Sequence, residues 1–129
     1  MIYTATLPAL ATASQDTAVV AGVYSQAFYS GDTVTDIQLV TPASYQTVTG
    51  AVTNNVTFSV RQLRNGTAIA ILGTLTVGAG TTLSPETAVP IPVGPQPILQ
   101  PGDILDVLMH QNGTGQALTS GLMVSIFIS

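Results

Sequence analysis

Few side chains in this chain could carry chemistry, and carboxylates are the largest group among them. Asp32 and Asp36 are four residues apart beside a strand-like segment, so alternation places both on one face. Paired acids can hydrolyse a glycosidic bond, or hold calcium together with carbonyl oxygens. However, Asp32 and Asp103 each follow a glycine, which is typical of turn residues whose carboxylates bond to the local backbone. We favour the turn interpretation and keep a calcium site between Asp32 and Asp36 as the alternative.

His110 is the only histidine, and the chain has no cysteine to act with it. A zinc site needs three or four protein ligands, which one histidine and six dispersed carboxylates do not supply. The chain contains the residue types of a Ser-His-Asp triad, but no Gly-x-Ser-x-Gly motif occurs. We therefore predict a protein that is not an enzyme and that binds no metal and no cofactor. We expect His110 in a strand, at a sheet edge or a subunit contact.

Arg61 and Arg64 are the only basic side chains. Nucleic-acid binding needs lysine and arginine on the binding face, so the sequence argues against a nucleic-acid partner. In a chain with so few charges, the two arginines suit salt bridges between subunits, which makes them candidate assembly residues. The alternative is that both are solvated side chains of a hairpin.

Charged residues make up 6% of the 129 residues, with no lysine and a net charge of −4. About a quarter is usual in soluble domains, where mixed surface charge keeps monomers apart. A chain without that charge is expected to have much of its surface covered, so we predict a homo-oligomer, with a trimer as the expected form. The absence of cysteine fits folding in a reducing cytoplasm. No apolar run approaches the roughly 18 residues of a membrane span.

The strongest structural signal is Asn65-Gly66, which lies between two strand-like runs. Both residue types tolerate positive φ, which a type I′ hairpin turn requires. Ahead of this turn, alternation places Val56, Phe58 and Val60 in the core. We therefore expect Phe58 to be a buried anchor.

Other short runs rich in Val, Ile and Thr, bounded by Gly, Pro and Asn, predict further strands. They cover residues 17–30, 34–41, 104–111 and 121–129. In the second run, alternation places Val34 and Asp36 on one face and Ile37 on the other. Five prolines within residues 81–100 restrict that segment to an edge strand or an extended loop. About seven or eight strands of this kind predict an all-β fold, a single two-sheet sandwich with jelly-roll-like connections.

The N-terminal segment, residues 1–15, shows no clear alternation or helical period. Its apolar residues Leu7, Pro8 and Leu10 follow no pattern, and a polar break separates them from the first predicted strand. We predict that residues 1–15 form an extended arm that crosses to a neighbouring chain, outside a β-sandwich domain of residues 16–129. These three apolar residues join the two arginines as candidate assembly residues.

Two stretches carry a resemblance to a known family. One is residues 50–60 (GAVTNNVTFSV), which run into the Asn-Gly hairpin, and the other is residues 99–126, which contain LQPGDILDV, GTG and GLMVSI. Together they resemble small β-sandwich proteins encoded among the head genes of tailed bacteriophages, the capsid decoration (cement) proteins. The Pro-Gly-Asp turn is also similar to turns of tumour-necrosis-factor-like trimers and cupin-type jelly rolls. The resemblance implies a trimer on a capsid lattice, with the major capsid protein as its partner, and it supplies no catalytic residue.

The leading hypothesis is therefore a structural protein of a virion, made in the host cytoplasm and placed on the capsid surface, where it stabilises coat-subunit junctions. One alternative is a receptor- or carbohydrate-binding head domain of a phage fibre. Such heads usually show aromatic platforms, whereas this chain has no Trp and its four Tyr lie within the first 45 residues. A second alternative is a small jelly-roll coat protein, although coat proteins around nucleic acid usually carry a basic arm.

Overall fold

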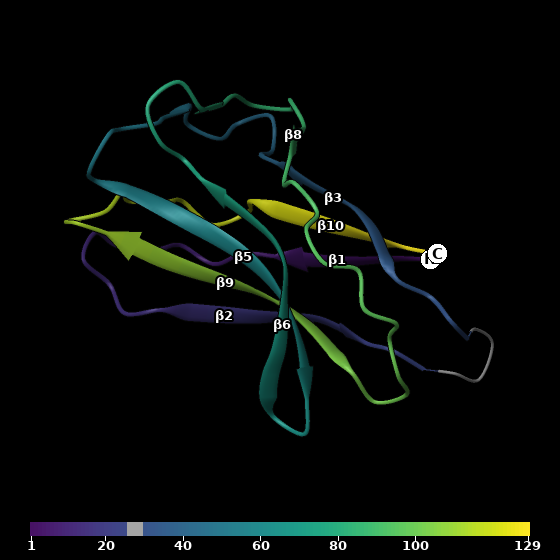
Figure 1. Ribbon diagram of the computed structural model, residues 1–129. Coiled ribbons are helices and arrows are strands. Elements are labelled where there is room, and N and C mark those ends of the chain that lie inside the picture. The colour runs from purple at the N-terminus through teal and green to yellow at the C-terminus, as the bar shows by residue number, and fades with distance from the viewer. Residues whose placement is uncertain (26–29) are drawn as a thin grey trace.

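Ten β-strands are present in the computed structural model, which describes residues 1–25 and 30–129 (Figure 1). Within these ranges, no helix is long and apolar enough to cross a membrane. The strands are β1 (Ile2–Thr6), β2 (Thr17–Val23), β3 (Val34–Val40), β4 (Val48–Thr49), β5 (Asn55–Arg64), β6 (Thr67–Thr76), β7 (Thr82–Leu83), β8 (Val89–Pro90), β9 (Ile104–Asn112) and β10 (Met123–Ile128).

The strands pair in a nested, antiparallel series. β1 pairs with β10, β2 with β9, β3 with β8 and β4 with β7. In the middle of the series, β5 and β6 pair with each other. The chain is therefore one long hairpin whose two ends meet in the β1–β10 pair. Wrapping such a hairpin into two sheets produces a jelly roll.

Two four-stranded sheets form the layers of the sandwich (Figure 1). The first sheet has the order β1-β10-β3-β8, the second has the order β2-β9-β5-β6, and β4 and β7 form a small separate ribbon. Both chain termini lie at the same end of the sandwich in Figure 1. The predicted all-β fold, a two-sheet sandwich with jelly-roll-like connections, is confirmed.

The alternation that predicted the strands matches the alternation of burial. Val56, Phe58 and Val60 are fully buried in β5, so the predicted core position of Phe58 is confirmed. Val124 and Ile126 of β10 are buried in the same core from the first sheet. Successive side chains of a strand point to opposite faces, and each sheet thus presents one apolar side to the other.

Two local signals in the sequence predicted the structure correctly. Asn65 and Gly66 have φ angles of 53° and 77°, the two positive values that a type I′ turn requires. In the proline-rich segment, the short β8 (Val89–Pro90) lies at the edge of the first sheet, because proline cannot donate to a central ladder. The predicted hairpin and the predicted edge strand are confirmed.

Two predicted strands differ in detail. The strand predicted over residues 17–30 ends at Val23, and residues 26–29 lie outside the described residues. In β3, Asp36 is paired with Phe127 while Val34 is paired with the next residue of β10, so one extra residue forms a β-bulge. The prediction that Val34 shares a face with Asp36 is wrong, because the bulge reverses the alternation and buries Val34.

Residues 1–15 do not form a separate arm in the structure. β1 pairs along its whole length with β10, and the backbone N–H of Leu7 donates to the carbonyl of Leu122 at 2.7 Å. The backbone N–H of Leu10 donates in the same way to the carbonyl of Leu118 at 2.8 Å. The predicted arm and the domain boundary after it are therefore wrong. The segment satisfies its backbone groups and buries its leucines within its own chain, which an arm in solvent does not achieve.

Candidate assembly surface

Arg64 and Asp103 form an ion pair within the chain, between the end of β5 and the turn before β9. Arg64 Nε donates to Asp103 Oδ1, and Arg64 Nη2 donates to Asp103 Oδ2, both at 2.8 Å. Oδ2 also accepts hydrogen bonds from Gln62 Nε2 at 2.7 Å and from the backbone N–H of Gln100 at 2.9 Å. The bond from Gln100 confirms that Asp103 has the predicted turn role.

These donors hold the Asp103 carboxylate in its charged form. Hydrogen bonds from Arg64 are the main cause that lowers the pKa of Asp103 to about 2, and bonds from Gln100 and Gln62 add to it against the effect of burial. The same pair raises the pKa of the Arg64 guanidinium. The Asp103 side chain is 1% exposed. The pair therefore works as a structural link between two distant parts of the chain.

Arg61 and Asp106 form a second intrachain ion pair in the middle of the second sheet. The two residues are directly opposite in the β5–β9 ladder. Arg61 Nε donates to Asp106 Oδ1 at 2.9 Å, and Arg61 Nη2 donates to Oδ2 at 2.6 Å. This hydrogen bonding raises the pKa of the Arg61 guanidinium. The bidentate pair places no net charge on the surface of the sheet.

Both arginines have partners within the chain. Arg61 and Arg64 each bind a carboxylate of their own chain with two nitrogens, so neither needs a salt bridge to another subunit, and their role in assembly stays a prediction. Their partners are 45 and 39 residues away in the sequence. Only the strand order brings these pairs together, so spacing alone did not reveal them.

The three apolar candidates from the N-terminal segment differ in their exposure to solvent. Leu7 and Leu10 are 2% and 4% exposed and belong to the chain's own core. The prediction that they are assembly residues is therefore corrected, because a buried side chain offers no contact to a neighbour. Pro8 is exposed and remains an untested candidate.

Three rows on the outward side of the second sheet form a largely apolar surface without net charge, which we call the neutral face. Residues that are directly paired across strands lie on the same side of a sheet, so the ladders define this face row by row. The first row is Val20, Asp106, Arg61 and Ile71. The second row is Val23, Ile104, Leu63 and Ala68, and the third row is Ala18, Leu108, Ser59 and Thr74. The next row on this side contains Thr76, Thr57 and His110, and His110 is paired with Asp16.

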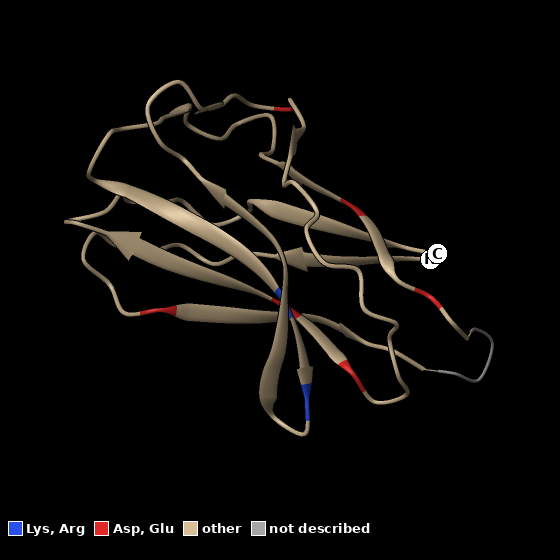
Figure 2. Ribbon diagram, in the orientation of Figure 1, with Lys and Arg blue, Asp and Glu red and all other residues tan. Residues whose placement is uncertain are grey.

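Large apolar side chains of the neutral face are exposed on either side of the central ion pair. Val20, Val23 and Ile71 are 60%, 56% and 54% exposed. Single exposed apolar residues are ordinary, but a contiguous apolar patch marks a surface that another molecule covers. Figure 2 shows how little of the ribbon carries any charge. The neutral face is therefore the candidate assembly surface of this chain.

The remaining titratable residues of interest do not form a larger cluster among the described residues. His110 lies in a strand, β9, as predicted. Because β9 is an inner strand, the sheet-edge position is wrong, and the alternative of a subunit contact stays a prediction. Its Nδ1 is 2.6 Å from Asp16 Oδ1. Asp32 accepts a hydrogen bond from the Tyr24 hydroxyl at 2.7 Å, and Asp36 accepts one from the backbone N–H that follows it at 2.9 Å. Among the described residues, no three His, Asp or Glu side chains are grouped to hold a metal ion.

Sequence reasoning missed the neutral face, although the chain carries a signal for it. Residues 68–72 of β6 are apolar throughout, and residues 18–23 of β2 contain no polar side chain. Strands with one solvated face alternate, whereas continuous apolar runs indicate strands that are covered on both faces. These runs therefore indicate that the outward side of the second sheet is covered as well as the core side.

The fold and this surface define a jelly-roll β-sandwich protein with one outer face on which the only charges of the described residues are a paired arginine and aspartate. No protein-family profile matches the chain, and no curated protein matches its sequence. Among solved structures, the chain is similar to a chain in the structure of infectious bursal disease virus, Gx strain, with a TM-score of 0.42 and 13% sequence identity. The match covers 98% of this chain and 31% of the viral chain, so this chain spans about a third of that chain's length.

Proposed function

We propose that this protein is a non-enzymatic structural component of a virus particle, which binds the outer capsid surface as an oligomer and stabilises junctions between coat subunits. The neutral face carries the proposal. Burying apolar surface contributes about 25 cal/mol per Å², and a face without an unpaired charge can be covered without desolvating one. The resemblance of residues 50–60 and 99–126 to decoration proteins supports this proposal. The jelly-roll fold also recurs in viral capsid domains, which is support by analogy.

A second copy of this chain is the proposed occupant of the neutral face. The neutral face has no net charge and therefore does not favour a charged partner. The same face on another copy of the chain has a matching apolar character. Four strands of at least seven residues give a face of roughly 450 Å², whereas a standard interface needs about 800 Å² per partner. One face-to-face contact is isologous, joins two chains and falls below that size. A trimer, in which each chain makes two contacts, therefore needs a second surface of the chain in addition to the neutral face.

Light scattering after size exclusion tests the oligomer directly. We expect a mass three times that of the 13.2 kDa chain. The variant Ile71→Asp places an unpaired charge in the neutral face and should shift the mass toward the monomer. Val52→Asp is the matched control, because Val52 is 81% exposed and lies in the loop before β5, outside the face. A monomeric natural protein at micromolar concentration would remove the oligomer, and equal behaviour of the two variants would remove the neutral face as its interface.

The capsid role is tested on particles. Virions with and without the protein should differ in the temperature or osmotic stress at which they break, and chelators should not reproduce the difference. The Ile71→Asp variant should bind particles more weakly than Val52→Asp, because a monomer makes one contact where a trimer makes several. Equal robustness with and without the protein would contradict the cement role.

A coat protein is the second candidate, and the jelly-roll strand order favours it. A shell surface that faces nucleic acid uses lysine and arginine. Here the only two such side chains are both held in intrachain ion pairs, which favours the decoration role. Electron microscopy of the concentrated protein separates the two, because closed shells formed by this protein alone would support a coat protein.

A further inference from the structure

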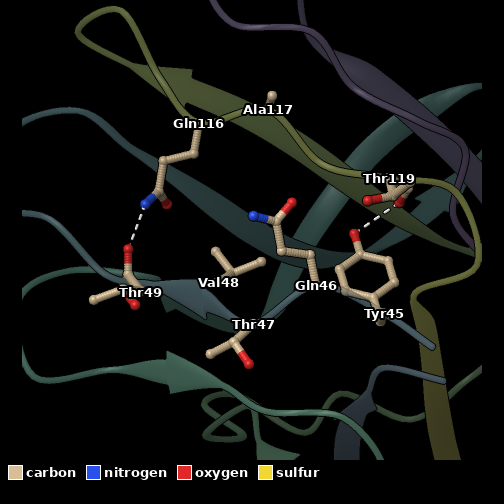
Figure 3. A pocket seen from close by; sticks show the side chains of 8 residues that line it. All are labelled: Tyr45, Gln46, Thr47, Val48, Thr49, Gln116, Ala117 and Thr119. Carbon is tan, nitrogen blue, oxygen red and sulfur yellow. Dashed lines mark hydrogen bonds between the residues drawn. The ribbon is translucent and has the colours of Figure 1, made fainter. Parts of the chain in front are cut away.

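A pocket of about 300 Å³ lies between two connections of the jelly roll, away from the neutral face. It is lined by residues 45–49, from the connection between β3 and β5, and by Gln116, Ala117 and Thr119, from the connection between β9 and β10 (Figure 3). This volume is at the lower end of the range for small-molecule sites. The pocket is therefore large enough for one small ligand or one unit of a larger ligand.

The walls of this pocket are fixed by hydrogen bonds to the backbone. The Tyr45 hydroxyl donates to the carbonyl of Thr119 at 2.7 Å, and Gln116 Nε2 donates to the carbonyl of Thr49 at 2.7 Å, so each bond joins one wall to the other. The buried side chain of Gln111 holds the backbone of Gln116, donating to its carbonyl at 2.6 Å and accepting from its N–H at 2.8 Å. A pocket braced in this way is formed before a ligand arrives, which lowers the entropy lost on binding.

Gln116, which lines this pocket, has an amide oxygen without a hydrogen-bond donor among the described residues. Its nitrogen must face the Thr49 carbonyl, because only the nitrogen can donate. This leaves Oε1 buried and without a hydrogen-bond donor from any described residue. A buried acceptor without a donor lowers stability by about 1–3 kcal/mol, so a small shift of the Gln116 amide that opens this oxygen to the pocket would favour a ligand that brings an O–H or N–H group.

The other polar side chains of the pocket are uncharged and are free to form hydrogen bonds with a ligand. The side chains of Gln46, Thr47 and Thr49 line the pocket, and none of them has a hydrogen bond to another described residue. Figure 3 shows the Gln46 amide across the pocket from Gln116. Together they offer amide and hydroxyl groups that both donate and accept. Hydroxyl groups of a ligand match such a lining, because each also donates and accepts.

Charge and apolar surface narrow the class of ligand. No Asp, Glu, Lys, Arg or His lines the pocket, and burial raises the pKa of Tyr45, which keeps its phenol neutral. An ionic ligand would find no counter-charge here. Val48 and Ala117 add apolar contact, which suits the C–H face of a sugar ring. We infer that this pocket binds a neutral saccharide unit through Gln46 and Gln116.

This inference goes beyond the structural role and does not depend on the oligomer. The test is a titration of the ¹⁵N-labelled full chain, followed by amide NMR shifts. The probes are the methyl glycosides of glucose, galactose, mannose and N-acetylglucosamine, with N-acetylneuraminic acid and inorganic phosphate as anionic comparisons. We expect saturable shifts at residues 45–49 and 116–119, including the side-chain amides of Gln46 and Gln116, with at least one neutral glycoside. The anions should produce none there.

Two variants test the contacts without disturbing the fold. The Gln46 side chain has no hydrogen bond to another described residue, so Gln46→Ala should not disturb the fold. It should weaken glycoside binding about 3- to 10-fold, as expected for the loss of one neutral hydrogen bond. Thr49→Val removes one hydroxyl at constant shape and leaves the carbonyl that binds Gln116; it should weaken binding by a similar factor. Gln96→Ala is the matched control, since Gln96 is exposed and does not line the pocket. It should bind like the natural chain.

Three results would overturn the inference. The first is an absence of saturable shifts in the pocket with every neutral glycoside up to about 50 mM, well above the concentrations at which weak specific sites saturate. The second is an equal response to the anions. The third is a Gln46→Ala variant that binds as well as Gln96→Ala. Any of them would leave the assembly proposal untouched, because that proposal is measured on the oligomer and on particles.

Discussion

Replacing Asp103 by asparagine tests how much the fold depends on its intrachain ion pairs. The Asp103 carboxylate is 1% exposed and accepts hydrogen bonds from Arg64, Gln62 and Gln100. An asparagine side chain at this position would keep the size of the group but would have one acceptor oxygen and an NH₂ group directed at other donors. The variant therefore loses the charge and leaves at least one N–H donor facing another donor.

The magnitude follows from the pKa of Asp103. A folded-state pKa of about 2 against an ordinary value of 3.8 corresponds to about 2 kcal/mol of stability. Because the folded-state pKa is the lower one, this contribution is complete above about pH 5 and is lost as the pH falls through 4 toward 2. A buried donor left without an acceptor adds about 1 kcal/mol or more. We expect Asp103→Asn to lower the free energy of unfolding by about 3 kcal/mol at neutral pH.

The assay is urea unfolding followed by circular dichroism, at one fixed protein concentration and at several pH values. Glu86→Gln is the matched control, because it makes the same charge change at an exposed residue and should alter stability by less than about 0.5 kcal/mol. The difference between the natural chain and Asp103→Asn should shrink by about 2 kcal/mol between pH 5 and pH 2. A difference that does not change with pH, or one no larger than that of the control, would refute the reasoning.

Three further predictions concern a core residue, the N-terminal segment and a closely packed glycine. Phe58→Ala should lower the free energy of unfolding by about 3–5 kcal/mol in urea, because Phe58 is fully buried; a change below about 1 kcal/mol would contradict its anchor role. Deleting residues 1–15 removes β1 and two buried leucines, so we expect a loss of at least about 4 kcal/mol and a large fall in Tm; an unchanged Tm would restore the separate arm. Gly50→Ala should destabilise by about 2 kcal/mol or more, because a Cβ there would overlap the carbonyl oxygen of Gly78. Gly94→Ala, where the nearest atom is 3.8 Å away, should melt like the natural chain.

The parts of the fold that the sequence predicted depend on local signals. Asn65-Gly66 specifies its turn through two adjacent backbone conformations. The buried side chains of β5 and β10 follow from a period of two within each strand. Neither inference needs any knowledge of which strands are neighbours. Local chemistry therefore predicted the hairpin, the core position of Phe58 and the class of fold.

The parts that were wrong depend on contacts between distant segments. β1 is held by β10, at the other end of the chain, and Leu7 and Leu10 show no period that would reveal their burial. Arg61 finds its carboxylate on β9, 45 residues away. A single bulge was enough to move Val34 to the opposite face. The candidate assembly residues were inferred from unpatterned or unpaired side chains, and the strand order provided the partners that the sequence could not show.

The position of the charges connects the fold to the proposed role. A charge on a covered surface must be desolvated, and it is tolerated only when a partner satisfies it. In this chain the two guanidinium groups are satisfied by Asp103 and Asp106 before any neighbour arrives, so the neutral face can be covered without breaking an ion pair. The saccharide pocket lies between the β3–β5 and β9–β10 connections and shares no residue with that face. An oligomer that covers the neutral face would therefore not use the residues that line the pocket. A structural role and a ligand-binding role are thus compatible in one small chain.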